Sequence, residues 1–235
     1  MGRMYAVLFD IDGTLIQTGG AGHLAFSRAF ADEFGVEKLA GDVSFAGRSD
    51  RAIALDLMRA HDVPATPATW LQFRRSYLTH LPGALAELNG VVLPGIEPLL
   101  IELGAMSHVA VGLLTGNLRA GAETKLSHYR LWGRFPFGGY GDESTDRSDI
   151  ARAALVEAER HAAENNGHSG PLLETMVVGD TVHDIRCARA IGAFAVAVPT
   201  GHSSADELAT ASPDLILPDL SDPRPLLERI EAIAG

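Results

Sequence analysis

Short runs of apolar residues recur along the chain, and helical patterns separate them. The runs are apolar throughout instead of alternating with polar residues, which is typical of parallel strands that helices cover on both faces. Strands alternating with helices of about ten residues predict βαβ units, and hence an α/β fold with a doubly wound, Rossmann-like parallel sheet. The predicted strands are 5–9, 109–114, 175–178, 194–198 and 215–217, and the predicted helices of this core are 97–105, 118–128, 149–165, 184–191 and 223–234.

The region between the first two predicted strands departs from this rhythm. From about residue 19 to about 93 the sequence has helical patterns and no convincing strand; the predicted helices are 22–34, 50–61 and 69–88. Roughly seventy residues are far too many for a crossover, so we expect a small helical domain inserted into the α/β core. We place the core at residues 1–18 and 92–235 and the helical cap at 19–91. The insert leaves the sheet at its ligand-binding edge, so we expect a lid; a decorative insert is the alternative.

Charge and composition exclude several classes of partner. The net charge is −11 and the chain has only two lysines, so nucleic acids and anionic membrane surfaces are poor partners. No apolar stretch approaches the roughly 18 residues of a membrane span, and the first apolar run is too short for a signal peptide. The single cysteine, Cys187, excludes an internal disulfide framework and suits a reducing compartment. We therefore expect a cytoplasmic protein, monomeric or homodimeric.

The first predicted strand ends in a pair of aspartates, Asp10 and Asp12. Two carboxylates so close beyond a buried strand repel each other unless a positive group offsets their charge. A divalent cation can do this, and carboxylate and carbonyl oxygens suit Mg²⁺. Gly13 permits an unusual turn, and Thr14 offers a hydroxyl to fix the loop. For the pair alone, an Asx turn followed by a helix cap is the alternative.

Polar residues follow two further predicted strands. Thr115, Gly116 and Asn117 offer a hydroxyl, an unhindered amide and a side-chain amide that can hold oxyanions, although a strand-to-helix cap is the alternative. Asp180 comes directly after a strand, and Asp184 lies near a helix start, where it could serve the helix dipole alone. All these clusters are predicted at the carboxyl edge of one parallel sheet.

These motifs resemble those of the haloacid dehalogenase-like superfamily of phosphohydrolases. Asp-x-Asp-Gly-Thr, an apolar strand ending in Thr-Gly-Asn, and Gly-Asp-x-x-x-Asp occur here in the family's order, from Asp10 to Asp184. The helical insert is similar to that of the phosphoglycolate phosphatase and β-phosphoglucomutase branch. The resemblance implies a Mg²⁺-dependent phosphatase of small phosphorylated metabolites that works through an aspartyl-phosphate. A sugar phosphomutase is the alternative within this chemistry, and an inactive binding or regulatory module is the alternative from another class.

The resemblance also assigns roles to the motif residues. Asp10 would be the nucleophile, and Asp12 the general acid and then the general base. Asp12 as the second aspartate favours phosphate esters over carbon–halogen or carbon–phosphorus bonds. The metal would be held by the Asp10 side chain, the Asp12 carbonyl and Asp180, supported by Asp184. The residues expected around the phosphate are Gly13, Thr14, Thr115, Gly116 and Asn117.

The family's third motif, a basic residue that is usually Lys and often followed by Pro, has no Lys-Pro counterpart here. The candidates are Arg147 and Lys125, and we favour Arg147 because it lies just ahead of a predicted helix and can bind a carboxylate and a phosphate together. In the predicted cap, Gly-Arg-Ser-Asp at 47–50 resembles a loop that faces the active site, so we expect Arg48 to contact an anionic part of the substrate; a helix start is the alternative. The polar stretch 160–174 is interpreted as a surface loop without chemistry.

Overall fold

The computed structural model describes residues 4–166 and 172–234. Its main element is a six-stranded sheet in the order β5-β4-β1-β6-β7-β8, and every pairing in it is parallel. The predicted α/β fold class is thereby confirmed. The strands of this sheet are β1 (Tyr5–Phe9), β4 (Val109–Leu114), β5 (Gly138–Gly139), β6 (Glu174–Gly179), β7 (Phe194–Ala197) and β8 (Leu215–Ile216).

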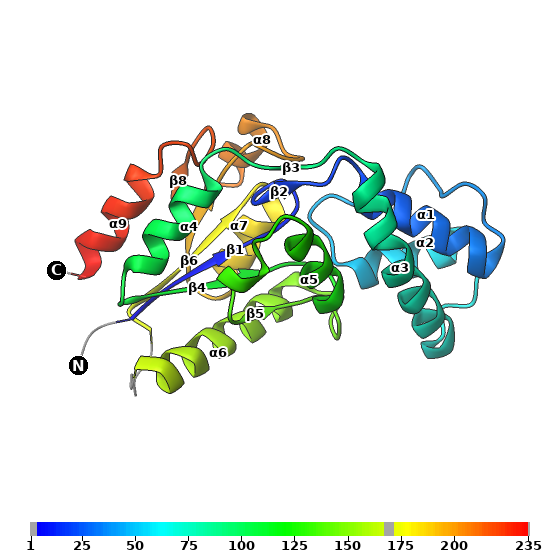
Figure 1. The fold of residues 1–235 in the computed structure, drawn as a ribbon, viewed down its shortest axis with the longest axis horizontal. Helices are drawn as coiled ribbons and strands as arrows, with labels where there is room; N and C mark the ends of the chain where they lie inside the picture. The colour runs from blue at the N-terminus through cyan, green and yellow to red at the C-terminus, as the bar shows by residue number, and fades with distance from the viewer. Residues whose placement is uncertain (1–3, 167–171, 235) are drawn as a thin grey trace.

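Helices cover both faces of the sheet, which explains the uniformly apolar strands. In β1, Tyr5, Val7 and Phe9 join the cluster beneath one helical layer, while Ala6 and Leu8 join the cluster beneath the other. The first layer consists of α4 (Ile96–Ala105), α5 (Arg119–His128) and α9 (Arg224–Ala234). The second consists of α6 (Arg147–Asn166), α7 (Val182–Ala190) and α8 (Ala205–Thr210). Figure 1 shows α4 and α9 on one side of the strands and α6 on the other.

A separate group of helices lies beyond one end of the sheet, away from both termini (Figure 1). It consists of α1 (Ala21–Phe34), α2 (Asp50–Ala60) and α3 (Pro67–Glu87). These helices share an apolar cluster of their own, in which Phe26, Phe30 and Phe73 are fully buried or nearly so. Two short antiparallel strands, β2 (Ile16–Gln17) and β3 (Val91–Val92), pair where the chain enters and leaves this group. The division into a core and a cap stays a prediction.

The structure corrects the sequence analysis at two places. Strand β3 lies within the stretch expected to contain no strand; its two residues are too few for a visible pattern, and only pairing with β2 defines it. Helix α6 extends to Asn166, so the loop interpretation of 160–174 is wrong for 160–166. Arg160 pairs with Glu157 and Glu164, and the periodicity continues to the buried Ala162. Residues 167–171 of that stretch lie outside the described residues.

Some elements escaped sequence analysis because they are short. They include β5, α8 and the 3₁₀ turn η1 (Trp132–Arg134). β5 consists of two glycines, which carry no strand propensity, and it is held by hydrogen bonds to β4. No helix of the described residues is long and apolar enough to cross a membrane.

The first helix after β3 begins at a glycine that no other residue can replace without strain. Gly95 has φ +80°, and a Cβ there would lie 1.8 Å from the Leu220 carbonyl oxygen. We therefore expect Gly95→Ala to lower the free energy of unfolding by at least about 2 kcal/mol. Gly104→Ala, in the same helix and with no atom within 4 Å of the new Cβ, should raise it by about 0.5–1 kcal/mol. Urea unfolding of both variants tests this, and equal effects would contradict it.

Candidate active site

The carboxyl ends of the central strands lie at one cavity between the sheet and α1–α3; Asp10 and Thr115 border it, whereas Asp180 and Asp184 are buried and do not. Asp10 follows β1, Thr115 follows β4 and Asp180 follows β6. The cavity has a volume of about 400 Å³. Its sheet side is lined by Asp10, Asp12, Gly13, Thr115, Gly116, Asn117, Lys125, Arg147, Gly201 and His202. Its other side is lined by residues 16–20, Gly22, His23, Phe26, Phe45, Gly47, Arg48, Asp50, Ile53 and Tyr77. Most of the predicted site residues therefore border a single cavity.

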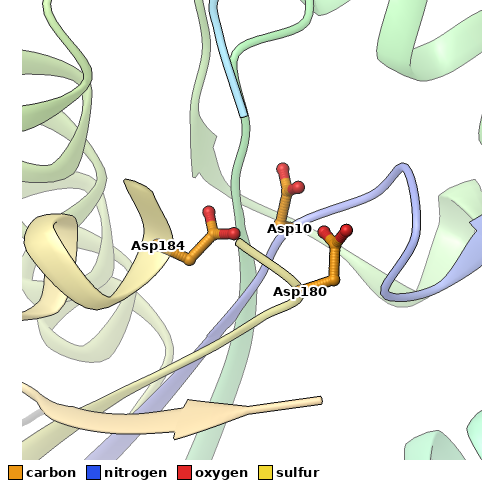
Figure 2. Close-up of side chains that lie close together, drawn as sticks. All are labelled: Asp10, Asp180 and Asp184. Atoms are coloured by element: carbon orange, nitrogen blue, oxygen red, sulfur yellow. The ribbon is translucent and has the colours of Figure 1, made fainter. Parts of the chain in front are cut away.

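Three buried aspartates form the acidic centre of the site (Figure 2). One carboxylate oxygen from each of Asp10, Asp180 and Asp184 lies within 4.8 Å of the others. Arg147 donates to Asp184 Oδ1 at 2.5 Å and approaches Asp10 Oδ1 at 3.6 Å. Burial, followed by repulsion from Asp184, raises the pKa of Asp10 well above its usual range, and the attraction of Arg147 offsets this only in part. A compact set of oxygen ligands with unbalanced negative charge fits a hard divalent cation such as Mg²⁺.

Local hydrogen bonds hold two of these carboxylates in place. Asp184 Oδ2 accepts from the amide and the hydroxyl of Thr181 at 3.0 and 2.7 Å, as part of the capping box that starts α7. Asp180 Oδ2 accepts from the His202 amide at 2.8 Å, and the Thr14 hydroxyl lies 3.4 Å from Asp180 Oδ1. Thr14 is buried and does not border the cavity, so its placement does not support the predicted phosphate contact.

Asp12 belongs to a different network. Its Oδ2 accepts from Lys125 Nζ at 2.6 Å and from Asn117 Nδ2 at 2.8 Å. Asn117 also accepts from Lys125 at 2.6 Å and donates to the Thr115 hydroxyl at 2.8 Å. Burial alone would raise the pKa of Asp12, but the Lys125 ammonium and the two hydrogen bonds outweigh it and lower the pKa. Asn117 therefore orients Asp12 and Thr115 in this structure.

The structure places both candidate cations in the site. Arg147 lies beside Asp10 and Asp184, whereas Lys125 serves Asp12. The sequence analysis treated the two as alternatives for the third motif; they have different partners here, and the preference for Arg147 stays a prediction. One signal for Lys125 was available: it falls on the apolar face of α5, between the buried Ala122 and Leu126. A buried lysine on such a face requires an acidic partner.

The loop before α2 docks against the end of β4. The Asp50 amide donates to the Gly116 carbonyl at 2.8 Å, and the Leu118 amide donates to Asp50 Oδ2 at 2.8 Å. A Cβ on Gly116 would lie 2.3 Å from the Arg48 carbonyl oxygen, so only glycine allows this approach. Asp50 was not identified from the sequence as a site residue because its partner is 68 positions away.

Arg48 borders the cavity, but its charge is already paired. Its guanidinium contacts the Asp56 carboxylate and donates to the Ser44 carbonyl at 3.2 Å. This pairing does not favour the predicted contact with an anionic part of the substrate. Tyr77 and His202 also border the cavity and were missed, because the sequence around them carries no motif.

Comparisons with known proteins agree with this geometry. Residues 149–223 match a family model described as HAD-hydrolase-like. The chain is 28% identical to a phosphoglycolate phosphatase of Synechococcus elongatus over 93% of this chain and 95% of that protein. It is 25% identical to a probable phosphatase, IndB, of Dickeya dadantii over 92% and 90% of the two chains. The structure of CbbY from Rhodobacter sphaeroides in complex with phosphate has a TM-score of 0.74 at 20% identity, covers 95% and 96% of the two chains, and shows the shared fold.

Asp50 predicts a dependence of stability on pH. Burial raises its pKa from 3.8 to about 6, although Lys125 and the Leu118 amide oppose the rise. A carboxyl with a raised pKa in the folded state contributes stability below its unfolded pKa and loses it as the pH rises through the folded value. Between about pH 4 and about pH 7, the unfolding free energy of the wild type should therefore fall relative to Asp50→Asn, by up to about 3 kcal/mol. Chemical unfolding across this pH range tests it; a constant difference between the proteins would count against the raised pKa.

Proposed function

We propose that this chain hydrolyses small phosphate monoesters with Mg²⁺ through an aspartyl-phosphate on Asp10. The premise is that the chain belongs to the haloacid dehalogenase-like hydrolases and is a phosphatase of that family. The observation that carries the proposal is the pair of environments at the end of β1. Asp10 lies in the acidic cluster beside Arg147, and Asp12 is hydrogen-bonded to Lys125 and Asn117. One strand end thus presents a nucleophile and a proton-transfer group to the same cavity.

The metal would be held by the carboxylates of Asp10 and Asp180 and the Asp12 carbonyl, with Asp184 in support. When bound, a divalent cation offsets the repulsion between an anionic nucleophile and an anionic phosphate. Arg147, which is buried and approaches Asp10 Oδ1 at 3.6 Å, would add a fixed positive charge beside the nucleophile. Thr115 and the Gly116 amide, with Gly13, are the groups proposed to hold the phosphoryl oxygens.

In the first step, an Asp10 carboxylate oxygen attacks phosphorus and the bond from phosphorus to the ester oxygen breaks. A carboxylate needs no base for this attack. Asp12 gives its proton to the departing oxygen, so that an alcohol leaves. The anionic phosphate beside Asp12 favours its protonated form, which counters the effect of Lys125.

In the second step, Asp12 accepts a proton from a water molecule as the water oxygen attacks the phosphorus of the aspartyl-phosphate. Phosphate leaves and Asp10 is restored as a carboxylate. Lys125 and Asn117 keep the Asp12 carboxylate at the same place in both steps, because both donate to the same oxygen, Oδ2. A phosphomutase would instead return the phosphoryl group to a sugar; dependence of turnover on a bisphosphate sugar would identify that alternative.

Residues 19–91 are proposed to act as a cap over this chemistry. The Asp50 contacts with Gly116 and Leu118 join this region to the sheet beside the cavity, which favours exclusion of water during phosphoryl transfer. The proposed partner is a small phosphorylated metabolite, and the proposed location is the cytoplasm. The protein is proposed to act as a monomer or homodimer.

The nucleophile is tested by replacing Asp10 with its neutral isostere. Asp10→Asn should reduce turnover of an aryl phosphate to background, because an amide cannot form the phosphoryl intermediate. The variant should stay folded, since volume is kept and a repulsive charge is removed from the cluster. Phosphate release and circular dichroism measure the two properties. Wild-type turnover in a folded variant would remove the covalent mechanism.

The two buried cations should affect catalysis differently. Arg147→Ala should lower kcat for aryl and alkyl phosphates alike, by about two to four decades, because it leaves Asp10 and Asp184 without their partner. Lys125→Met should lower kcat for alkyl phosphates at least about tenfold more than for aryl phosphates, because it disturbs Asp12, whose proton a poor leaving group needs most.

The other lysine of the chain provides the control. Lys38 is exposed, so Lys38→Met should leave both rates unchanged. Steady-state kinetics with one aryl and one alkyl phosphate decide the comparison. Equal losses for both substrates in Lys125→Met would show that Lys125 does not act through the leaving-group acid.

A further inference from the structure

We propose that the cavity selects esters whose leaving group is an uncharged alcohol carrying a ring, with a polar group that hydrogen-bonds to Tyr77. The inference rests on the proposed phosphatase function and names its substrate class. It is carried mainly by the part of the cavity that α1–α3 and their loops supply. Four features of the cavity bear on the leaving group: its charge balance, its aromatic wall, the hydroxyl of Tyr77 and its size.

The charge balance disfavours a second anion on the substrate. Among the described residues that border the cavity, each Lys or Arg already faces a carboxylate: Lys125 faces Asp12, Arg147 faces Asp184, and Arg48 faces Asp56. The imidazole of His202 lies 3.4 Å from Asp180 Oδ2. A carboxylate or second phosphate on the leaving group would have to break one of these pairs or stay unpaired. Breaking a pair is costly at Lys125 and Arg147, which are buried, and less so at the partly exposed Arg48–Asp56 pair.

An aromatic wall forms the side of the cavity opposite the phosphate-binding loops. The rings follow one another in contact in the order His23, Phe45, Phe26 and Tyr77, with centroids 5.0, 5.2 and 4.7 Å apart. Ile53 completes this surface, and Phe26, Ile53 and Tyr77 are buried. Such a wall favours a ring or another apolar surface over a fully hydrated chain.

Tyr77 adds a polar group to this wall. Its ring is fully buried, stacked on Phe73, and its hydroxyl has no hydrogen-bond partner among the described residues. Burial also raises the pKa of this hydroxyl, so that it stays neutral and able to donate. A buried hydroxyl without a partner is unfavourable, and in a binding cavity the missing partner is supplied by the ligand. The structure therefore assigns Tyr77 as a specificity-determining residue.

The size of the cavity agrees with a ring-bearing alcohol. Its volume of about 400 Å³ falls within the range of roughly 300–1,000 Å³ typical of sites for drug-sized ligands. A two-carbon hydroxy acid attached to phosphate would occupy the floor of such a cavity and leave the aromatic wall uncovered.

Matched phosphonates test the inference independently of turnover, because their carbon–phosphorus bond replaces the ester. The probes are phenylethylphosphonate, its para-carboxy derivative, and the short pair propylphosphonate and phosphonopropionate, titrated calorimetrically into the full chain with Mg²⁺. Phenylethylphosphonate should bind at least about tenfold more tightly than each of the other three. Equal or tighter binding of either carboxylate would overturn the charge argument, and equal binding of propylphosphonate would overturn the ring argument.

The Tyr77 assignment is tested with the ortho-, meta- and para-hydroxyphenyl derivatives of the same probe. At least one isomer should bind about threefold to tenfold more tightly than phenylethylphosphonate, and Tyr77→Phe should remove this gain. Tyr129→Phe is the matched control, because the Tyr129 hydroxyl is also buried, has no hydrogen-bond partner within residues 4–166 and 172–234, and does not border the cavity. A gain that survives Tyr77→Phe, or no gain with any isomer, would overturn the assignment.

Turnover separates the two proposals. Benzyl phosphate and phosphoglycolate are assayed with the same protein and Mg²⁺, and we expect benzyl phosphate to have the higher kcat/KM by at least about tenfold. If neither ester is hydrolysed while phenylethylphosphonate binds more tightly than the other probes, the phosphatase proposal fails and the ligand class stands. If both are hydrolysed but phosphoglycolate is preferred, the phosphatase proposal stands and the ligand class fails.

Discussion

Electrostatic repulsion among three buried aspartates is the constraint on which the site depends. Asp10, Asp180 and Asp184 come from two neighbouring parallel strand ends and from the helix that follows one of them. Arg147 lies beside Asp10 and Asp184 as a cation. Burial in a low dielectric makes this arrangement costly, and the raised pKa of Asp10 expresses that cost. Three features of the fold hold these aspartates and Arg147 together despite the cost of burial: the parallel sheet, the capping box of α7 and the N-terminus of α6. A bound divalent cation would offset this repulsion, so the arrangement suits a cation-binding centre.

Two aspartates separated by one residue have opposite electrostatic environments. Asp10 turns toward the acidic cluster and its pKa is raised, whereas Asp12 turns toward Lys125 and Asn117 and its pKa is lowered. Groups whose surroundings push their pKa values apart can take different chemical roles. Residues i and i+2 of a strand point to the same side, so strand geometry does not separate the two carboxylates. They meet different neighbours because the chain leaves β1 after Phe9 and turns, with Gly13 at φ +87°.

The helical region contributes to the site from outside the sheet. Its own apolar cluster allows α1–α3 to pack together, and polar contacts tie it to the sheet side. Asp142, for example, pairs with Arg74 of α3 at 3.0 Å and accepts from the Arg119 amide at the start of α5 at 2.7 Å. One wall of the cavity is therefore aromatic, and the other is acidic and hydrogen-bonding. We propose that the first recognises the leaving group and that the second carries the chemistry at phosphorus.

The sequence by itself determined the fold class, the positions of Asp10, Asp12, Thr115 and Asp180 at strand ends, and the helical nature of the region near 19–91, because strand periodicity, helix periodicity and the polar strand ends are local properties. It did not determine the order of the strands, the two-residue strands, or the partners of Lys125, Arg48 and Asp50. Those depend on contacts between residues far apart in the chain, such as Lys125 with Asp12, 113 positions away. Only the tertiary structure decided which carboxylate each cation serves, and that Tyr77 borders the cavity with a hydroxyl that has no partner in the part of the chain the structure describes. The physical reason is that a side chain's charge balance and hydrogen-bond partners are set by the elements packed against it and not by its neighbours in sequence.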